Sequence, residues 1–141
     1  MSASVAPEEL GRLSLLADLE PAVWAELAGH AYRRRMARGE GLFRAGDPLR
    51  AVYGVLSGHV QLSRLAADGS EKVVEIIGPG ETFAEAVLFF QREEYPVEAR
   101  GLEAGELLAL DAAGLDRLLD AHPRLMRQML GSLSRRLHGL V

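Results

Sequence analysis

The chain has 141 residues, of which 48% are hydrophobic and 26% are charged, as in a single soluble globular domain. It contains no cysteine, which excludes disulfides, thiolate metal sites and cysteine nucleophiles. The net charge of −4 argues against binding of a nucleic acid backbone by this chain alone. No apolar run approaches the ~20 residues of a membrane span, and the N-terminus lacks the pattern of a signal peptide, so we expect a cytoplasmic protein.

Residues 1–37 are predicted to form helices. Pro7 is followed by two glutamates and by leucines at helical spacing as far as Ala17. Pro21 then opens a second apolar stripe, which contains Trp24 and ends at Ala31. The stripe predicts that these helices pack onto the part of the chain that follows.

Residues 38–111 have the pattern of a β domain. Short apolar runs are separated by turn signals at Gly46-Asp47-Pro48, Ser57-Gly58, Asp68-Gly69 and Gly78-Pro79-Gly80. Their spacing of roughly 8–12 residues is typical of an antiparallel sandwich or barrel.

Two segments of this region have a more specific prediction. The alternating run 59–64 and the run 72–77 are joined by Asp68-Gly69, which predicts a β-hairpin. Residues 81–90 contain good helix formers without alternation, so we expect a short helix inside the β region. Its free N–H groups would suit an anion or a polar ligand.

Residues 112–141 are predicted to form two further helices. Asp111 suits an N-cap, and His122-Pro123 separates the two helices. The second helix carries an apolar seam of Leu125, Met129, Leu133, Leu137 and Leu140, flanked by arginines. The seam would pack on the chain's own barrel or on a partner helix. For a homodimer we expect contacts through Met129, Leu133, Leu137 and Leu140.

Several motifs occur in one order along the chain: Arg38-Gly39-Glu40, residues 42–48, Ser57-Gly58, Asp68-Gly69, residues 80–85 and Arg135-Arg136-Leu137. Together they resemble the effector domain of the Crp/Fnr family of transcription regulators, over nearly the whole chain. The resemblance implies a mainly β fold with flanking helices. The expected architecture is a double-stranded β-roll (a jelly-roll like that of cyclic nucleotide-binding domains), followed by the start of a dimerisation helix. Residues 1–141 would form one effector-sensing domain.

In that family a helix-turn-helix module follows the dimerisation helix and reads DNA. This chain does not contain that module, so any contact with DNA would be made by a separate domain. A chain cut within a longer regulator is the first explanation, and a natural stand-alone sensor is the second.

The family's cyclic nucleotide site uses a glutamate for the ribose and an Arg-Ser pair for the phosphate. The resemblance places Glu85 at the glutamate position and Tyr95-Pro96 at the Arg-Ser position. Arg136 matches a ligand-side arginine of the terminal helix, whereas Leu140 and Val141 align with polar contacts to the adenine. Arg92 or Arg100 could replace the missing arginine. An ordinary cyclic nucleotide is therefore the less favoured ligand.

The string from Phe83 to Phe89, followed by Tyr95, is more similar to the Dnr-like branch, which is named for dissimilative nitrate respiration. Members of that branch are taken to sense nitric oxide through a bound haem, so haem is a possible cofactor. The axial ligand would be one of the four histidines, a methionine or Tyr95. Alternation points His59 away from Leu62 and hence away from the pocket.

The residues predicted to bind the effector share a position on the inside of the roll or on the helix that closes it. They are Leu62, Val74, Phe83, Ala84, Glu85, Ala86, Tyr95, Pro96 and Arg136, and the same cavity would be lined by Phe43, Val87, Leu133 and Leu137. Glu85 has an alternative role, because a carboxylate in a first turn stabilises a helix without any ligand.

The predicted function is ligand-gated regulation and not catalysis, since no nucleophile with a base and no metal-binding set has a recognisable spacing. Three alternatives stay open. They are a cyclic nucleotide-binding module with altered phosphate contacts, a metal-dependent β-barrel enzyme, and a protein-interaction domain with an empty roll.

Overall fold

The computed structural model describes residues 4–139. Its helices are α1 (Pro7–Leu10), α2 (Pro21–Ala28), α3 (Glu85–Phe89), α4 (Ala112–Ala121) and α5 (Pro123–Leu137). Its strands are β1 (Ala31–Met36), β2 (Gly41–Phe43), β3 (Ala51–Ser57), β4 (Val60–Leu65), β5 (Glu71–Ile77), β6 (Thr82–Phe83), β7 (Glu98–Gly101) and β8 (Gly105–Asp111).

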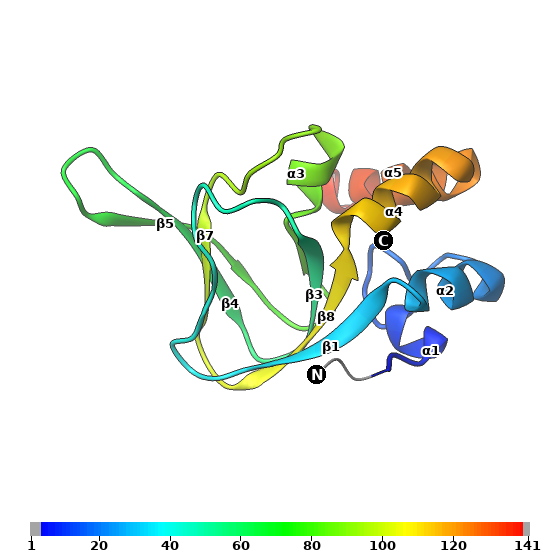
Figure 1. The fold of residues 1–141 in the computed structure, drawn as a ribbon, viewed down its shortest axis with the longest axis horizontal. Coiled ribbons are helices and arrows are strands. Elements are labelled where there is room, and N and C mark those ends of the chain that lie inside the picture. The colour runs from blue at the N-terminus through cyan, green and yellow to red at the C-terminus, as the bar shows by residue number, and fades with distance from the viewer. Residues whose placement is uncertain (1–3, 140–141) are drawn as a thin grey trace.

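The strands form two antiparallel sheets of four, in the orders β1-β8-β3-β6 and β2-β7-β4-β5. Figure 1 shows α1, α2, α4 and α5 gathered at one end of this roll, whereas the β4–β5 hairpin projects from the opposite end. The arrangement confirms the predicted fold class, a β-roll with flanking helices.

The core has two parts. In the first, leucines of α1, α2, α4 and α5 pack against one face of β3 and β8. The second lies between the sheets and contains the aromatic side chains of Phe43, Tyr53, Phe83 and Tyr95. Side chains of β8 alternate between the two parts, with Leu108 and Leu110 in the first and Leu107 and Ala109 in the second.

Several local predictions are confirmed. β4 pairs with β5 as an antiparallel hairpin. The side chain of Asp111 accepts a hydrogen bond of 2.8 Å from the backbone N–H of Gly114, so Asp111 caps α4 as expected. His122 separates α4 from α5, and Pro123 is the first residue of α5.

The predicted boundary between the N-terminal helices and the β region, at residue 38, is wrong. The first strand begins at Ala31. Residues 31–36 form β1, which pairs with β8 along its whole length. Three consecutive arginines hide the alternation of this strand. Arg33 forms ion pairs with Glu9 and Glu106, and Arg34 is 3.7 Å from Glu40, so charge pairing replaces the apolar signal.

The predicted helices at residues 7–17 and 81–90 are shorter in the structure. α1 ends at Leu10, and turns continue as far as Leu19. In the β region, the first residues of the expected helix form β6, which pairs with β3, and α3 begins only at Glu85.

Candidate functional site

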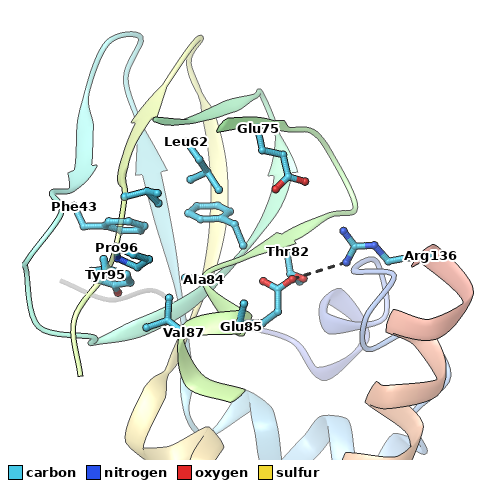
Figure 2. A pocket seen from close by; sticks show the side chains of 13 residues that line it. Phe43, Leu62, Glu75, Thr82, Ala84, Glu85, Val87, Tyr95, Pro96 and Arg136 are labelled. Atoms are coloured by element: carbon cyan, nitrogen blue, oxygen red, sulfur yellow. Dashed lines mark ion pairs between the residues drawn. The ribbon is translucent and has the colours of Figure 1, made fainter. Parts of the chain in front are cut away.

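A pocket lies between the two sheets, closed by α3 on one side and by the C-terminal part of α5 on another (Figure 2). Its cavity volume is about 170 Å³. The lining residues are Phe43, Leu62, Glu75, Thr82, Phe83, Ala84, Glu85, Ala86, Val87, Tyr95, Pro96, Val97 and Arg136. The structure thus brings together all the predicted effector residues except Val74. Phe43 and Val87 line the pocket as predicted, whereas Leu133 lies in a separate groove and Leu137 is exposed, so neither lines it.

Val74 does not line the pocket, and its side chain is exposed. The register of β4 and β5 shifts at this point: Leu62 pairs with Glu75, whereas Ser63 pairs with Val73. Val74 is therefore the extra residue of a β-bulge, and Glu75 faces the pocket with Leu62. Sequence alternation could not place Glu75 there, because a bulge changes which residues share a face.

One end of the pocket is aromatic. The rings of Phe43 and Tyr95 stack with centroids 3.6 Å apart, and the rings of Tyr53 and Phe83 stack at 5.2 Å. Burial raises the pKa of Tyr53 to about 12, so its phenol stays neutral at physiological pH. Tyr53 does not line the pocket itself but packs against Phe83, which does. The aromatic wall is thus apolar and carries no charge.

The hydroxyl of Tyr95 is fixed by the backbone. It donates a hydrogen bond of 2.9 Å to the carbonyl of Ala51 and accepts bonds from the N–H groups of Arg50 and Ala51 at 3.3 and 3.2 Å. The ring therefore forms part of the pocket wall while its polar atom binds the backbone of β3. Tyr95 thus has a structural role in this chain.

The other end of the pocket is polar. Nη1 of Arg136 on α5 lies 3.9 Å from Oε1 of Glu85 on α3, as the dashed line in Figure 2 shows. The side chain of Glu85 is 13% exposed and that of Arg136 is 32% exposed. Burial raises the pKa of Glu85 above its ordinary value of 4.5, although Arg136 opposes this change. This pair is an ionic link between the roll and the terminal helix.

Glu85 comes immediately after a sharp change of backbone direction. Ala84 has φ of 72° and ψ of 0°, the left-handed conformation that L-residues adopt at a cost of about 1–2 kcal/mol. The chain passes in this one residue from β6 into α3. The turn places Glu85 next to Thr82 at the polar end of the pocket (Figure 2).

The two arginines considered as substitutes for a phosphate ligand lie outside this pocket. Arg100 is 3.5 Å from Glu98 and 3.9 Å from Glu71 on the surface of the sheet. Arg92 lines a separate hollow beside α4. Among residues 4–139, Arg136 is thus the only cation that lines the pocket.

The pocket does not fit a haem, which requires an axial side chain. Within residues 4–139 no histidine lines it: His59 and His122 pair with glutamates on the surface, His138 follows the last residue of α5, and His30 lies against α4. No methionine of the described part lines it either, and the hydroxyl of Tyr95 is held by β3. The volume is also below the ~300–1,000 Å³ of pockets for drug-sized ligands.

The predicted dimerisation residues differ in burial along α5. Met129 is buried in the chain's own core, Leu133 is half-buried, and Leu137 is 82% exposed. Leu140 lies outside the described residues. The exposed apolar stripe instead runs through Met126, Leu130, Leu133 and Leu137, and beside it lies a groove that also contains Phe89 and Phe90. Sequence spacing could not distinguish the two stripes, because both repeat at helical intervals.

Residues 4–139 contain no group of three or more His, Asp or Glu side chains placed to hold a metal ion. None of the helices in this part is both long enough and apolar enough to cross a membrane.

Residues 33–122 match the family model described as cyclic nucleotide-binding domain. The chain is 30% identical over 132 residues to the CRP-like cAMP-activated global transcriptional regulator of Mycobacterium tuberculosis, covering 92% of this chain and 58% of that protein. It is 32% identical over 102 residues to the transcriptional activator protein anr of Pseudomonas aeruginosa, covering 72% and 41%. The chain thus spans about half the length of these relatives.

The solved structures agree with these sequence matches. DNR from Pseudomonas aeruginosa superposes with a TM-score of 0.85 at 29% identity, over 99% of this chain and 61% of that one. The sensor domain of the transcriptional regulator DNR gives a TM-score of 0.80 at 30% identity, over 94% and 88%.

Proposed function

Because this chain belongs to the cyclic nucleotide-binding domain family of Crp/Fnr-type regulators, a family of binding domains and not of enzymes, we propose that it senses a small-molecule effector. The effector would bind in the pocket between the roll and α5 and change how α5 packs. A helix-turn-helix domain elsewhere in the regulator would then respond at its DNA site in the cytoplasm.

The observation that carries this proposal is the ion pair between Glu85 and Arg136, which spans the polar end of the pocket (Figure 2). Glu85 belongs to α3 in the roll, and Arg136 belongs to the last turn of α5. An effector that binds either side chain must compete with the pair or extend it. Occupancy of the pocket is thereby coupled to the position of α5.

The chemistry of the pocket also favours an effector other than an ordinary cyclic nucleotide. Tyr95-Pro96 stands where the family's Arg-Ser pair binds the phosphate, and the hydroxyl of Tyr95 is already bound to Ala51. The site thus lacks the bidentate arginine that supplies the strongest contacts to a phosphate. A cyclic nucleotide module with altered contacts is the second candidate, supported by the retained glutamate Glu85.

The coupling can be tested without knowing the effector. Removing either partner of the pair is expected to speed amide hydrogen exchange in the last two turns of α5, with Arg136→Gln having the larger effect. The asymmetry follows from burial, because Arg136→Gln leaves the more buried carboxylate unpaired, whereas Glu85→Gln leaves an arginine closer to solvent. A partly exposed pair contributes about 0.2–1 kcal/mol, so we expect a change of a few-fold.

Arg127→Gln is the matched control, since Arg127 is an exposed arginine of the same helix that forms no ion pair with residues 4–139. Equal exchange in all three variants would contradict coupling of the pocket to α5 through this pair.

We further propose that α5 pairs with a second copy of the chain through Met126, Leu130, Leu133 and Leu137. These side chains form a continuous apolar stripe that the roll leaves uncovered or half-covered. Leu130→Asp is expected to convert a dimer into a monomer, as measured by sedimentation velocity. Arg127→Asp, on the neighbouring polar face, should leave the dimer intact. A dimer that survives Leu130→Asp would contradict this interface.

A further inference from the structure

The polar end of the pocket carries more negative than positive charge. Glu85 and Glu75 both line it, and Arg136 is the one cation that lines it among residues 4–139. Arg136 already pairs with Glu85, so its charge is largely balanced. Glu75, which lies on the strand above Glu85 in Figure 2, is left to repel an incoming anion.

Thr82 gives an independent indication that a ligand binds here. Its side chain lines the pocket and is 2% exposed. Its Oγ1 interacts with the Glu85 carboxylate strongly enough to oppose the rise in the pKa of Glu85, but it makes no hydrogen bond of ordinary length with the described residues. A buried hydroxyl without a partner costs about 1–3 kcal/mol. In Figure 2 it lies directly beside the Glu85 carboxylate. One polar group of a ligand could form hydrogen bonds to both the Thr82 hydroxyl and the Glu85 carboxylate.

The size and shape of the cavity restrict the rest of the ligand. Its volume of about 170 Å³ is close to that of an engineered protein cavity of about 150 Å³ that binds benzene. The opposite wall is formed by Phe43, Tyr95, Pro96 and Val97. One aromatic ring stacked on this wall would fill the apolar end, and a short arm would reach Thr82 and Glu85.

Resting on the proposed sensing function, we propose that the pocket selects a neutral or positively charged ligand that has a single aromatic ring and a hydroxyl or amine group. The ligand's O–H or N–H donates to the carboxylate of Glu85 and its polar atom also bonds the hydroxyl of Thr82. The charge preference of the site is thus opposite to that of a phosphate-binding pocket.

Three probes on one ring system test the charge preference: 2-phenylethylamine, 2-phenylethanol and phenylacetate, each titrated into the purified chain by calorimetry, with cyclic AMP as a fourth. We expect the amine to bind most tightly, the alcohol next, and phenylacetate at least about tenfold more weakly than the amine. Glu75→Gln should reduce the difference in affinity between 2-phenylethylamine and phenylacetate. Glu94→Gln removes the same charge from the surface outside the pocket and should leave this difference unchanged.

Thr82→Val separates binding from stability. It should weaken binding of the amine and the alcohol several-fold, while the free energy of unfolding changes by no more than about 1 kcal/mol, because the hydroxyl makes no hydrogen bond of ordinary length and valine keeps the shape of the side chain. Undiminished binding by Thr82→Val would overturn the assigned contact.

Tighter binding of phenylacetate or cyclic AMP than of the amine, or no binding of the amine and the alcohol at millimolar concentration, would overturn the inference. The hydrogen-exchange response of α5 to Arg136→Gln is measured without any ligand. If α5 shows this response, the proposed sensing function stands even when the inference about ligand charge fails. If α5 shows no response, the proposed sensing function itself is contradicted.

Discussion

Gly105→Ala is expected to lower the free energy of unfolding by about 2–3 kcal/mol, the cost of forcing atoms into a filled site. A Cβ at residue 105 would lie 2.1 Å from the carbonyl oxygen of Ser57 and 2.7 Å from its carbonyl carbon. Both are backbone atoms of β3, so no side-chain rotation can relieve the clash. The strands β3 and β8 must separate at this point, where their register already shifts between Val55 and Ser57.

Gly41→Ala is the control for this substitution. Residue 41 is also in a strand, its φ is not positive, and a Cβ there meets no atom within 4 Å. We expect a change within about 0.5 kcal/mol, or a small gain from a less flexible unfolded chain. Urea denaturation of both variants measures the difference. Equal midpoints would mean that β3 and β8 accommodate the extra methyl group.

Tyr95→Phe is expected to cost about 1–3 kcal/mol of stability, because it leaves the buried N–H and carbonyl of Ala51 without their side-chain partner. The ring itself, stacked on Phe43, is unchanged in size. The loss of stability therefore measures the contribution of the Tyr95 hydroxyl and not that of the ring. Thermal and urea denaturation give the free energy, and the aromatic wall of the pocket should stay in place.

Tyr32→Phe provides the comparison, since the Tyr32 hydroxyl makes no hydrogen bond within residues 4–139 and the ring is half-buried. Its effect should be near zero. A loss in Tyr95→Phe no greater than in Tyr32→Phe would show that the hydroxyl does not hold the pocket wall to β3.

Much of the fold could be predicted because its signals are local. The Asp68-Gly69 turn places two strands side by side, and Gly69 has φ of 87°, a conformation that glycine adopts without a steric penalty. The Asp111 cap and the His122-Pro123 junction likewise act within one helical turn. Such signals fix where elements begin and end without reference to the rest of the chain.

The remaining features depend on contacts between distant residues. β1 is recognisable as a strand only through β8, because its run of three arginines shows no apolar alternation and Arg33 pairs with residues as far away as Glu9 and Glu106. The bulge that turns Glu75 into the pocket depends on the pairing of β4 with β5. The side of α5 that packs on the core, with Met129 inward and Leu130 outward, depends on the position of the whole helix. No single segment of sequence contains this information.

The projecting β4–β5 hairpin has a consequence for handling the domain in solution. β5 is an edge strand of its sheet, and Val73, Val74 and Ile76 are all about half exposed along it. Unpaired backbone groups beside apolar side chains form a template on which a strand of another molecule can add. Glu71 and Lys72 place charges at one end of this edge and Glu75 places another within it, but Val73, Val74 and Ile76 remain exposed between them. In concentrated preparations, self-association should therefore begin at this hairpin and increase with salt, which screens the protecting charges.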